Sequence, residues 1–233
     1  MRTSYRVKSF QQMASELENS YKVPTGMDII DKILGGLSVG HIHSIIGDSG
    51  VGKSWFCQRI VNSFLEDNNN ASVLYSDFSG NIHQKNLIKT IKSPKLLKQV
   101  SFYRPTSLQE NIILGKKILD GYLPNISLIV LDTIFGSPLD FYDLIGNSKK
   151  KTERKIFEFM MDLRSIANQY HIPIIITHFP SSNSTETTQD KEVRIDPFCT
   201  TKSVLRKFGN ASSLKLYAFN QYLGSTAFNL FSD

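Results

Sequence analysis

Residues 42–60 read Ile42-His43-Ser44-Ile45-Ile46-Gly47-Asp48-Ser49-Gly50-Val51-Gly52-Lys53-Ser54-Trp55-Phe56-Cys57-Gln58-Arg59-Ile60, and this stretch decides the fold. It predicts an apolar strand, a glycine-rich turn and a helix, in that order. The turn fits G-x-x-x-x-G-K-[ST], the phosphate-binding loop, and it has the strand-to-helix context that this pattern requires. The alternative is a glycine-rich turn that merely begins a helix, for which spacing, Lys-Ser ending and context would have to agree by chance.

The predicted loop has the chemistry of a polyphosphate site. Its glycines allow backbone conformations that are closed to other residues and leave room for a phosphate chain. Successive N–H groups and the positive end of the following helix attract the phosphates. Lys53 is expected to reach the β- and γ-phosphates, and the Ser54 hydroxyl is expected to bind Mg²⁺. We therefore expect ATP and Mg²⁺ as cofactors, with the nucleotide held by Gly47, Asp48, Ser49, Gly50, Val51, Gly52, Lys53 and Ser54.

Length and composition set broad limits. The 233 residues are 40% hydrophobic, and no Pro-, Gly- or Ser-rich linker divides them, so one large domain is expected. The net charge of +6 is compatible with a polyanionic partner but does not require one. Of the two cysteines, Cys57 and Cys199, one is expected to be buried under the nucleotide site, so a disulfide between them is not expected and a reducing compartment is. No apolar run approaches the roughly 20 residues that span a bilayer, so we expect an intracellular chain without a membrane partner.

A second pattern precedes the loop. Thr25-Gly26, Asp31, Leu34-Gly35-Gly36 and Gly40 stand in an order and spacing that resembles the RecA/RadA recombinase superfamily. Residues 52–58 resemble its archaeal and eukaryotic RadA branch more than bacterial RecA. The resemblance covers about residues 25–230 and does not include the family's amino-terminal DNA-binding domain. The chain therefore looks like a core-only paralogue, of the RadB kind or like the eukaryotic recombinase paralogues.

The resemblance implies an α/β fold. It is a RecA-like P-loop ATPase core, with a mostly parallel twisted sheet flanked by helices and a carboxyl-terminal antiparallel hairpin. Residues 24–233 form this core, and 1–23 form an extension whose helix, 10–18, packs on its own domain or docks on a neighbouring subunit.

Apolar periodicity predicts further elements of the core. Strands are expected at 72–77, 100–103, 126–133 and 172–178, and helices at 81–91, 108–119 and 152–170. The helix at 108–119 is expected to turn Ile112, Ile113 and Leu114 inward. The helix at 152–170 is expected to bury Ile156, Phe157, Met160, Leu163, Ile166 and Ala167. Thr25 or Asp28 is expected to cap a short helix. Residues 202–208 look like a short basic helix. Residues 214–219 and 225–231 look like the closing hairpin, with its turn at Gln221-Tyr222-Leu223-Gly224.

Four residues are candidates for the chemistry beside the loop. Asp132 ends the apolar run 126–132 and fits the residue that holds Mg²⁺ opposite Ser54, although it could instead cap the next segment. Ser79 stands where the family resemblance implies a glutamate that polarises water. A serine is a poor general base, so hydrolysis should be slow or absent unless Asp77 substitutes. His178 stands where the family has an Asn or Gln that senses the γ-phosphate, and it is either such a sensor or a structural histidine.

Two groups of basic residues are candidates for nucleic-acid contact. The first follows a loop at 135–149 in the place of the family's first DNA-binding loop, where lysines can neutralise backbone phosphates. Lysines at the start of a helix oppose its dipole, so they need some other reason to be there. The loop at 179–201 takes the place of the second DNA-binding loop but carries more acid than base. The candidates are Lys149, Lys150, Lys151 and Arg154, together with Arg206 and Lys207.

Three functional classes follow. The first is a recombinase paralogue that binds ATP, single-stranded DNA or a recombinase partner, and assists homologous recombination repair with at most weak ATPase activity. The second is a KaiC-like signalling ATPase, and the third a scaffold subunit that nucleotide stabilises. Cytoplasmic localisation is expected for an archaeal source and nuclear localisation for a eukaryotic one.

Overall fold

The computed structural model describes most of the predicted core. The described residues are 9, 21–78, 80, 91, 93–123, 125–135, 149–180, 195–208, 211–218 and 221–228. Some expectations fall outside them: the helix at 10–18, Ser79, all but the last residue of the helix at 81–91, and most of the two loops compared with DNA-binding loops.

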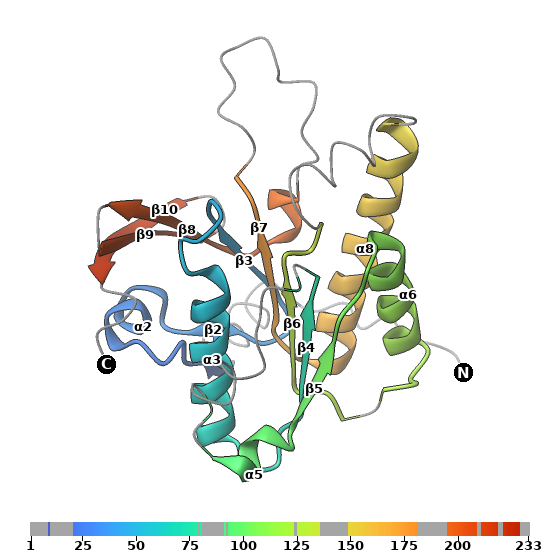
Figure 1. Cartoon of the computed structure of the whole chain (residues 1–233), viewed down its shortest axis with the longest axis horizontal. Coiled ribbons are helices and arrows are strands. Elements are labelled where there is room, and N and C mark those ends of the chain that lie inside the picture. Colours follow the sequence, from blue (N-terminus) through green and yellow to red (C-terminus); the bar gives the residue numbers. More distant parts are fainter. Residues whose placement is uncertain are drawn as a thin grey trace.

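An eight-stranded sheet organises the fold, in the order β10-β9-β8-β3-β7-β6-β4-β5 (Figure 1). Every neighbouring pair from β8 to β5 is parallel, and β9 is antiparallel to both of its neighbours, β8 and β10. The predicted α/β class, with its mostly parallel sheet and antiparallel end, is therefore confirmed. The strands are β3 (Ile42–Ile46), β4 (Val73–Asp77), β5 (Val100–Tyr103), β6 (Leu128–Asp132), β7 (Ile174–His178), β8 (Thr201–Phe208), β9 (Ala211–Ala218) and β10 (Gln221–Phe228).

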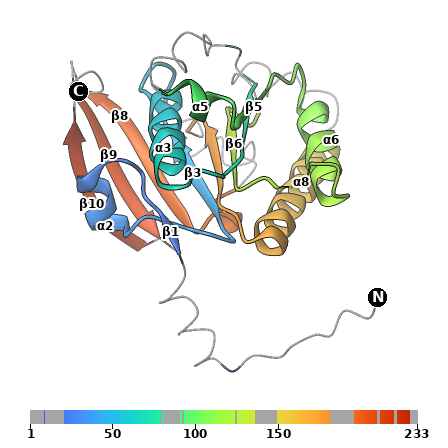
Figure 2. The ribbon, with the colours of Figure 1, turned by 90° about the horizontal axis from the view of Figure 1, so that it is seen from below.

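Helices cover both faces of this sheet (Figure 2). Alternate strand residues point to opposite faces. Val73 and Tyr75 therefore join the core under α3 (Lys53–Asp67), whereas Leu74 joins the core under α6 (Leu108–Leu119) and α8 (Lys149–Tyr170). Central strands buried on both faces explain the continuous apolar runs in the sequence. The described helices are α2 (Asp28–Leu34), α3 (Lys53–Asp67), α5 (Pro94–Leu97), α6 (Leu108–Leu119), α8 (Lys149–Tyr170) and the 3₁₀ helix η2 (Asp196–Phe198), and a small sheet pairs β1 (Lys22–Val23) with β2 (Leu37–Ser38).

Two side chains that were expected in the core face solvent instead. Ile113 on α6 is 44% exposed and Phe157 on α8 is 56% exposed, so these two assignments were wrong. Phe159, at 1% exposure, lies instead on the face of α8 that is buried in the protein core. This face is formed by positions 156, 159, 160, 163, 166 and 167, which have helical spacing. The Phe157 ring packs edge-to-face with Phe198 of η2, with ring centroids 5.3 Å apart.

The end of the chain also differs from the prediction. Residues 202–208 form most of strand β8, not a basic helix, because they pair with β3 on one side and β9 on the other. The antiparallel pair of β9 and β10 begins β10 at Gln221, so Gln221–Gly224 belong to a strand and not to the predicted turn. A register shift between Tyr222 and Gly224 marks a bulge in β10.

The segment before β3 packs closely on α3. Neither Thr25 nor Asp28 caps α2, since Met27 is the N-cap residue and its side chain makes no capping hydrogen bond. Instead, the Thr25 N–H donates to the Asp31 carboxylate at 2.9 Å. A Cβ on Gly26 would lie 2.9 Å from Ser63 Cβ of α3, which gives a packing reason for glycine here.

Within the described ranges, no helix is both long and apolar enough to cross a membrane.

Candidate nucleotide site

The loop Gly47–Ser54 lies where β3 gives way to α3, as predicted. The Gly47 N–H donates to the carbonyl oxygen of His178 on the neighbouring strand β7, at 3.3 Å. A Cβ on Gly47 would lie 2.6 Å from Val51 Cγ2 and 2.8 Å from the Leu205 carbonyl oxygen, so the loop fits tightly against β8. Gly52, at φ +100°, is the N-cap residue of α3 and turns the chain into the helix.

Lys53 is buried at the start of α3. Its Nζ donates to the carbonyl oxygens of Gly47 at 2.8 Å and Asp48 at 2.9 Å, and it lies 4.4 Å from the centroid of the Phe179 ring. Burial lowers the pKa of the Lys53 ammonium, while the nearby carboxylates of Asp132 and Asp48 raise it. The loop therefore holds a cation at the position where the sequence predicts contact with phosphate.

Asp132, at the end of β6, accepts hydrogen bonds from the side chains around it. The Tyr75 hydroxyl donates to Oδ2 at 2.9 Å, and the Thr177 hydroxyl donates to Oδ1 at 2.7 Å. Ser54, in the first turn of α3, is a further hydrogen-bond partner. Burial raises the pKa of the Asp132 carboxyl, these hydrogen bonds oppose the rise, and Asp77 adds to it. The structure thus brings together Ser54 and Asp132, the two predicted metal ligands.

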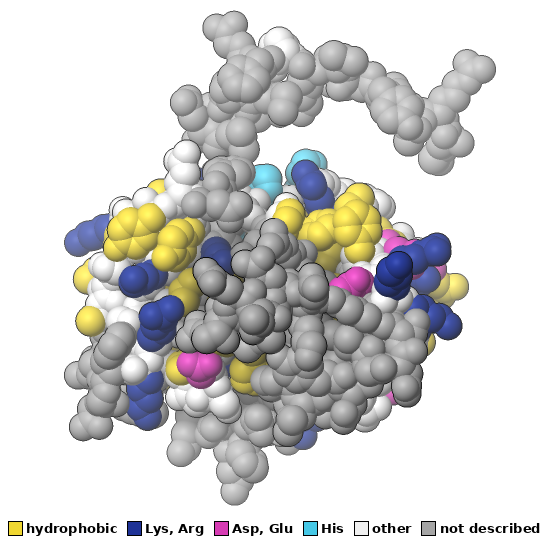
Figure 3. Space-filling model, turned by 90° about the horizontal axis from the view of Figure 1, so that it is seen from above, with side chains coloured by type: hydrophobic (Ala, Val, Ile, Leu, Met, Phe, Trp, Pro, Cys, Tyr) yellow, Lys and Arg dark blue, Asp and Glu magenta, His cyan; other side chains and the backbone are white. Residues whose placement is uncertain are grey.

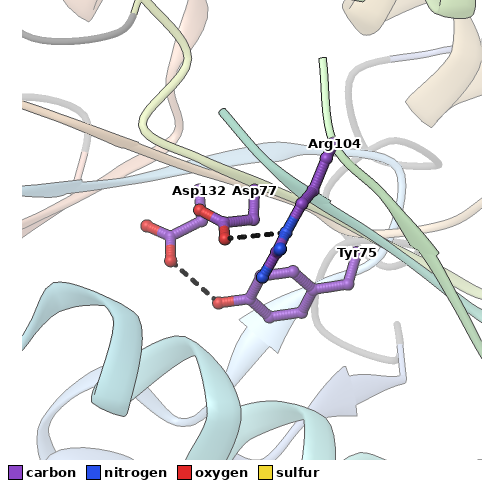
Figure 4. Close-up of polar contacts among 4 residues, drawn as sticks. All are labelled: Tyr75, Asp77, Arg104 and Asp132. Carbon is purple, nitrogen blue, oxygen red and sulfur yellow. Dashed lines mark hydrogen bonds and ion pairs between the residues drawn. The ribbon is translucent and has the colours of Figure 1, made fainter. Parts of the chain in front are cut away.

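A second carboxylate lies beside the first. Asp77 ends β4 and is the register partner of Asp132 on β6. It is fully buried, and Nε of Arg104, the residue after β5, lies 3.8 Å from its Oδ2. Figure 4 shows the two carboxylates side by side, with Arg104 contacting Asp77 and Tyr75 contacting Asp132. A buried carboxylate paired with a cation is poorly placed to take a proton from water, which weighs against Asp77 as a substitute base.

His178 ends β7 next to the loop. Its Nδ1 lies 2.9 Å from the carbonyl oxygen of Phe179, and because a carbonyl only accepts, Nδ1 carries the proton. In the neutral ring Nε2 is then an acceptor, so only the imidazolium could donate from Nε2 to a phosphate. His178 as a γ-phosphate sensor stays a prediction.

The two groups of predicted DNA-contact residues stand on opposite sides of the sheet edge that carries the Gly47–Ser54 loop. Lys150, Lys151 and Arg154 are exposed in the first turns of α8, and Arg154 pairs with Glu158 at 2.8 Å. Arg206 and Lys207 are exposed near the end of β8, on the other side of β3. Figure 3 looks onto this edge, where Lys and Arg side chains gather at two opposite sides. Lys149 begins α8, and its side chain lies outside the described part of the structure.

Sequence reasoning missed three residues of this site. Tyr75 and Thr177 hold the Asp132 carboxylate, and Arg104 pairs with Asp77. One signal was present for Tyr75, because it lies two positions before Asp77 and therefore on the same face of β4. Nothing in the sequence pairs Arg104 with a residue 27 positions away.

The amino-acid sequence of this chain is similar to those of known proteins. The chain matches no protein-family model. It is 31% identical over 140 residues to the "DNA repair and recombination protein RadB" of Methanococcus maripaludis, a match that spans 59% of this chain and 62% of that protein. A protein of the same name from Methanobrevibacter smithii is 24% identical over 173 residues, spanning 72% of this chain and 71% of the relative.

A solved structure is also similar. It is titled "Crystal structure of the RadB recombinase", and it superposes with a TM-score of 0.72 at 18% identity, covering 89% of this chain and 95% of that one. At this identity the likeness shows the fold, while the sequence matches connect the chain to RadB proteins. The chain is therefore RadB-like, with the RecA-type fold of the RecA/RadA superfamily.

Proposed function

We propose that this chain binds ATP with Mg²⁺ and assists homologous recombination repair by contacting DNA, a recombinase partner, or both. The observation that carries the proposal is the arrangement of Lys53, Ser54 and Asp132 around the Gly47–Ser54 loop. The relatives named for DNA repair and recombination supply the biological context. We further propose that residues 24–233 are the nucleotide-binding core.

The site residues fit a magnesium nucleotide. The loop puts backbone N–H groups and the start of α3 at one place, and the Lys53 ammonium lies beside them. Ser54 and Asp132 supply the hydroxyl and carboxylate oxygens that Mg²⁺ prefers, and Thr177 and Tyr75 orient the carboxylate. Mg²⁺ bound there would neutralise phosphate charge, while this chain's residues bind and orient the nucleotide.

Slow hydrolysis is part of the proposal. The position that the resemblance assigns to a water-polarising glutamate carries Ser79, whose surroundings lie outside the described residues. The neighbouring carboxylate of Asp77 is buried against Arg104. Without a general base, the rate should be lower by a factor of about 10² to 10⁴ than in an enzyme that has one.

The nucleotide claim is tested by calorimetric titration of the intact chain with ATP and ADP, each with Mg²⁺. We expect saturable heat that disappears in Lys53→Ala, and unchanged binding in Lys155→Ala. Lys155 is the matched control because it is an exposed lysine on α8 that contacts Gln109, on the opposite face of the sheet from α3. Absence of heat in the wild-type chain would refute the proposal.

The nucleic-acid claim needs a separate assay. Fluorescence anisotropy with labelled single-stranded DNA at low salt, with and without magnesium nucleotide, should show binding that weakens steeply as salt rises. Lys150→Ala/Lys151→Ala should weaken it about uniformly across sequences, because phosphate contacts carry no sequence information. Arg206→Ala/Lys207→Ala tests the other side of the edge. If neither pair changes binding, these residues do not contact DNA.

Co-purification from the source cell tests the partner. A recombinase-related protein that is recovered with the chain supports the proposal. A closed ring without DNA binding would favour the signalling ATPase. Nucleotide binding without turnover or DNA binding would favour the scaffold.

A further inference from the structure

Phe179 is an aromatic residue placed against the loop lysine. Its ring centroid lies 4.4 Å from Lys53 Nζ, within the distance at which a cation is attracted to an aromatic face. The neighbouring main chain holds it there: the His178 carbonyl accepts from Gly47 N–H, and His178 Nδ1 donates to the Phe179 carbonyl. Phe179 is therefore tied to the same loop that positions Lys53.

Most of the Lys53 ammonium is already in contact with the protein. It has three N–H donors, and two of them are used by the carbonyl oxygens of Gly47 and Asp48. The residue is only 7% exposed, and the Phe179 ring covers the ammonium. A phosphate that approaches Nζ must therefore replace at least one of these contacts.

We propose that the Phe179 ring competes with nucleotide phosphate for the Lys53 ammonium and so lowers the affinity of this chain for nucleotide. The inference rests on the proposed function, since it concerns nucleotide at the same loop. Phosphate carries full negative charge and displaces the ring, but the lost cation–π attraction is subtracted from the binding free energy. Between an exposed and a fully desolvated cation, this attraction corresponds to a factor of about 2 to 30 in an equilibrium constant.

The contact itself can be tested without nucleotide. In proton NMR of the intact chain, the ε-methylene protons of Lys53 should be shifted upfield by the ring current of Phe179. Phe179→Leu should remove the shift because leucine fills similar space without a π face, and Phe179→Tyr should keep it. Random-coil shifts for Lys53 in the wild-type chain would overturn the inference.

Nucleotide affinity is the second measurement. The single tryptophan, Trp55, follows Ser54 and reports on the loop through its intrinsic fluorescence. In titrations with MgADP, Phe179→Leu should bind about 2- to 30-fold more tightly than wild type. Phe179→Tyr and the control Phe198→Leu, at a half-buried ring that packs on Phe157, should bind as wild type does.

The outcomes separate the two claims. If Phe179→Leu binds MgADP no more tightly than wild type while remaining folded, the inference fails and the proposed function stands. If the wild-type chain binds no MgADP although the upfield shift is present, the proposed function fails and the inference falls with it. Tighter binding in Phe179→Leu but not in Phe179→Tyr supports both.

Discussion

Asp77 and Asp132 are register partners at the ends of adjacent parallel strands, yet the structure gives them opposite surroundings. Asp132 accepts from the Tyr75 and Thr177 hydroxyls, whereas Asp77 pairs with the Arg104 guanidinium. Hydroxyl donors leave the Asp132 carboxylate negative and oriented, while the cation beside Asp77 neutralises its charge. We therefore expect Asp132, not Asp77, to hold the proposed Mg²⁺.

Tyr75→Phe should weaken the hold on Asp132. It removes one hydrogen bond to a buried carboxylate, which typically contributes about 1.5–3 kcal/mol to stability. We also expect nucleotide binding to need more Mg²⁺, because the carboxylate is less firmly oriented. Urea unfolding and calorimetric titrations at several Mg²⁺ concentrations measure the two effects.

The control for this variant is Tyr170→Phe. Tyr170 lies in the last turn of α8, and its hydroxyl donates to the Ile118 carbonyl at 3.0 Å. The variant removes this hydroxyl. It should lower stability modestly and leave the Mg²⁺ requirement unchanged. An equal change of that requirement in both variants would contradict a specific role for Tyr75.

Arg104→Met should destabilise the fold through Asp77. Removing one partner of a buried ion pair costs about 3–5 kcal/mol, but the Arg104 side chain is 47% exposed, so solvent screening reduces the expected loss to about 1–2 kcal/mol. The double variant Arg104→Met/Asp77→Asn should recover part of the loss, since no unpaired charge is then buried. Urea unfolding of the wild type, Arg104→Met, Asp77→Asn and the double variant gives the coupling energy of the pair. Additive losses of stability would argue against an interaction between Arg104 and Asp77.

His43 should make stability depend on pH. It is buried in β3, where its Nε2 donates to the Ser38 carbonyl at 2.8 Å and its Nδ1 lies 2.7 Å from the Thr201 hydroxyl. Burial lowers the pKa of His43 to about 4. The unfolded chain, with a histidine pKa near 6.5, therefore binds the proton first as pH falls. The stability that neutral His43 provides is complete above about pH 6.5 and is lost progressively toward pH 4, by about 3 kcal/mol in total.

Urea unfolding at pH 7.5, 6.0, 5.0 and 4.5 measures this dependence. His43→Gln keeps a donor for the Ser38 carbonyl but does not titrate, so its stability should fall less steeply over this range. The pKa of His41 is lowered by burial and by Arg164, and the charge of His41 also lowers the pKa of His43. Because His41 is present in both chains, the difference between them reports the titration of His43 together with its coupling to His41. Parallel curves for the two chains would contradict the prediction.

The sequence predicted those elements whose pattern is local. The strand-loop-helix unit at 42–60 and the aspartate at the end of β6 follow from glycine spacing and a continuous apolar run. It failed at β8, because Val204, Leu205 and Phe208 have spacings that suit a helix as well as a strand. Pairing with β3, which is distant in sequence, and with the following strand β9 decides between them.

The same limit applies to the site. The Arg104 contact with Asp77 and the Phe179 contact with Lys53 depend on which strands lie side by side, and the sheet order is not written in any short motif. Phe157 shows a related ambiguity. It follows the buried Ile156 in the sequence, but the rotation from one helix residue to the next takes it off the buried face of α8.

Gly47→Ala should disturb the loop more than Gly50→Ala. An added Cβ at Gly47 meets the Leu205 carbonyl oxygen at 2.8 Å, and that oxygen belongs to the main chain of the paired strand β8, so it cannot move away cheaply. At Gly50 the space is open, and the cost is the left-handed backbone at φ +75°, about 1–2 kcal/mol. Overpacking at Gly47 should cost about 1–3 kcal/mol and also displace the loop.

Urea unfolding and MgADP titration together separate these two effects. For Gly47→Ala we expect a lower unfolding midpoint together with weaker MgADP binding, because the first amide of the loop moves away from the His178 carbonyl that it contacts. Gly121→Ala, at φ +78° with open space and outside the loop, is the control for backbone strain alone. If Gly47→Ala binds MgADP as tightly as Gly121→Ala, the close approach of β8 does not set the shape of the loop.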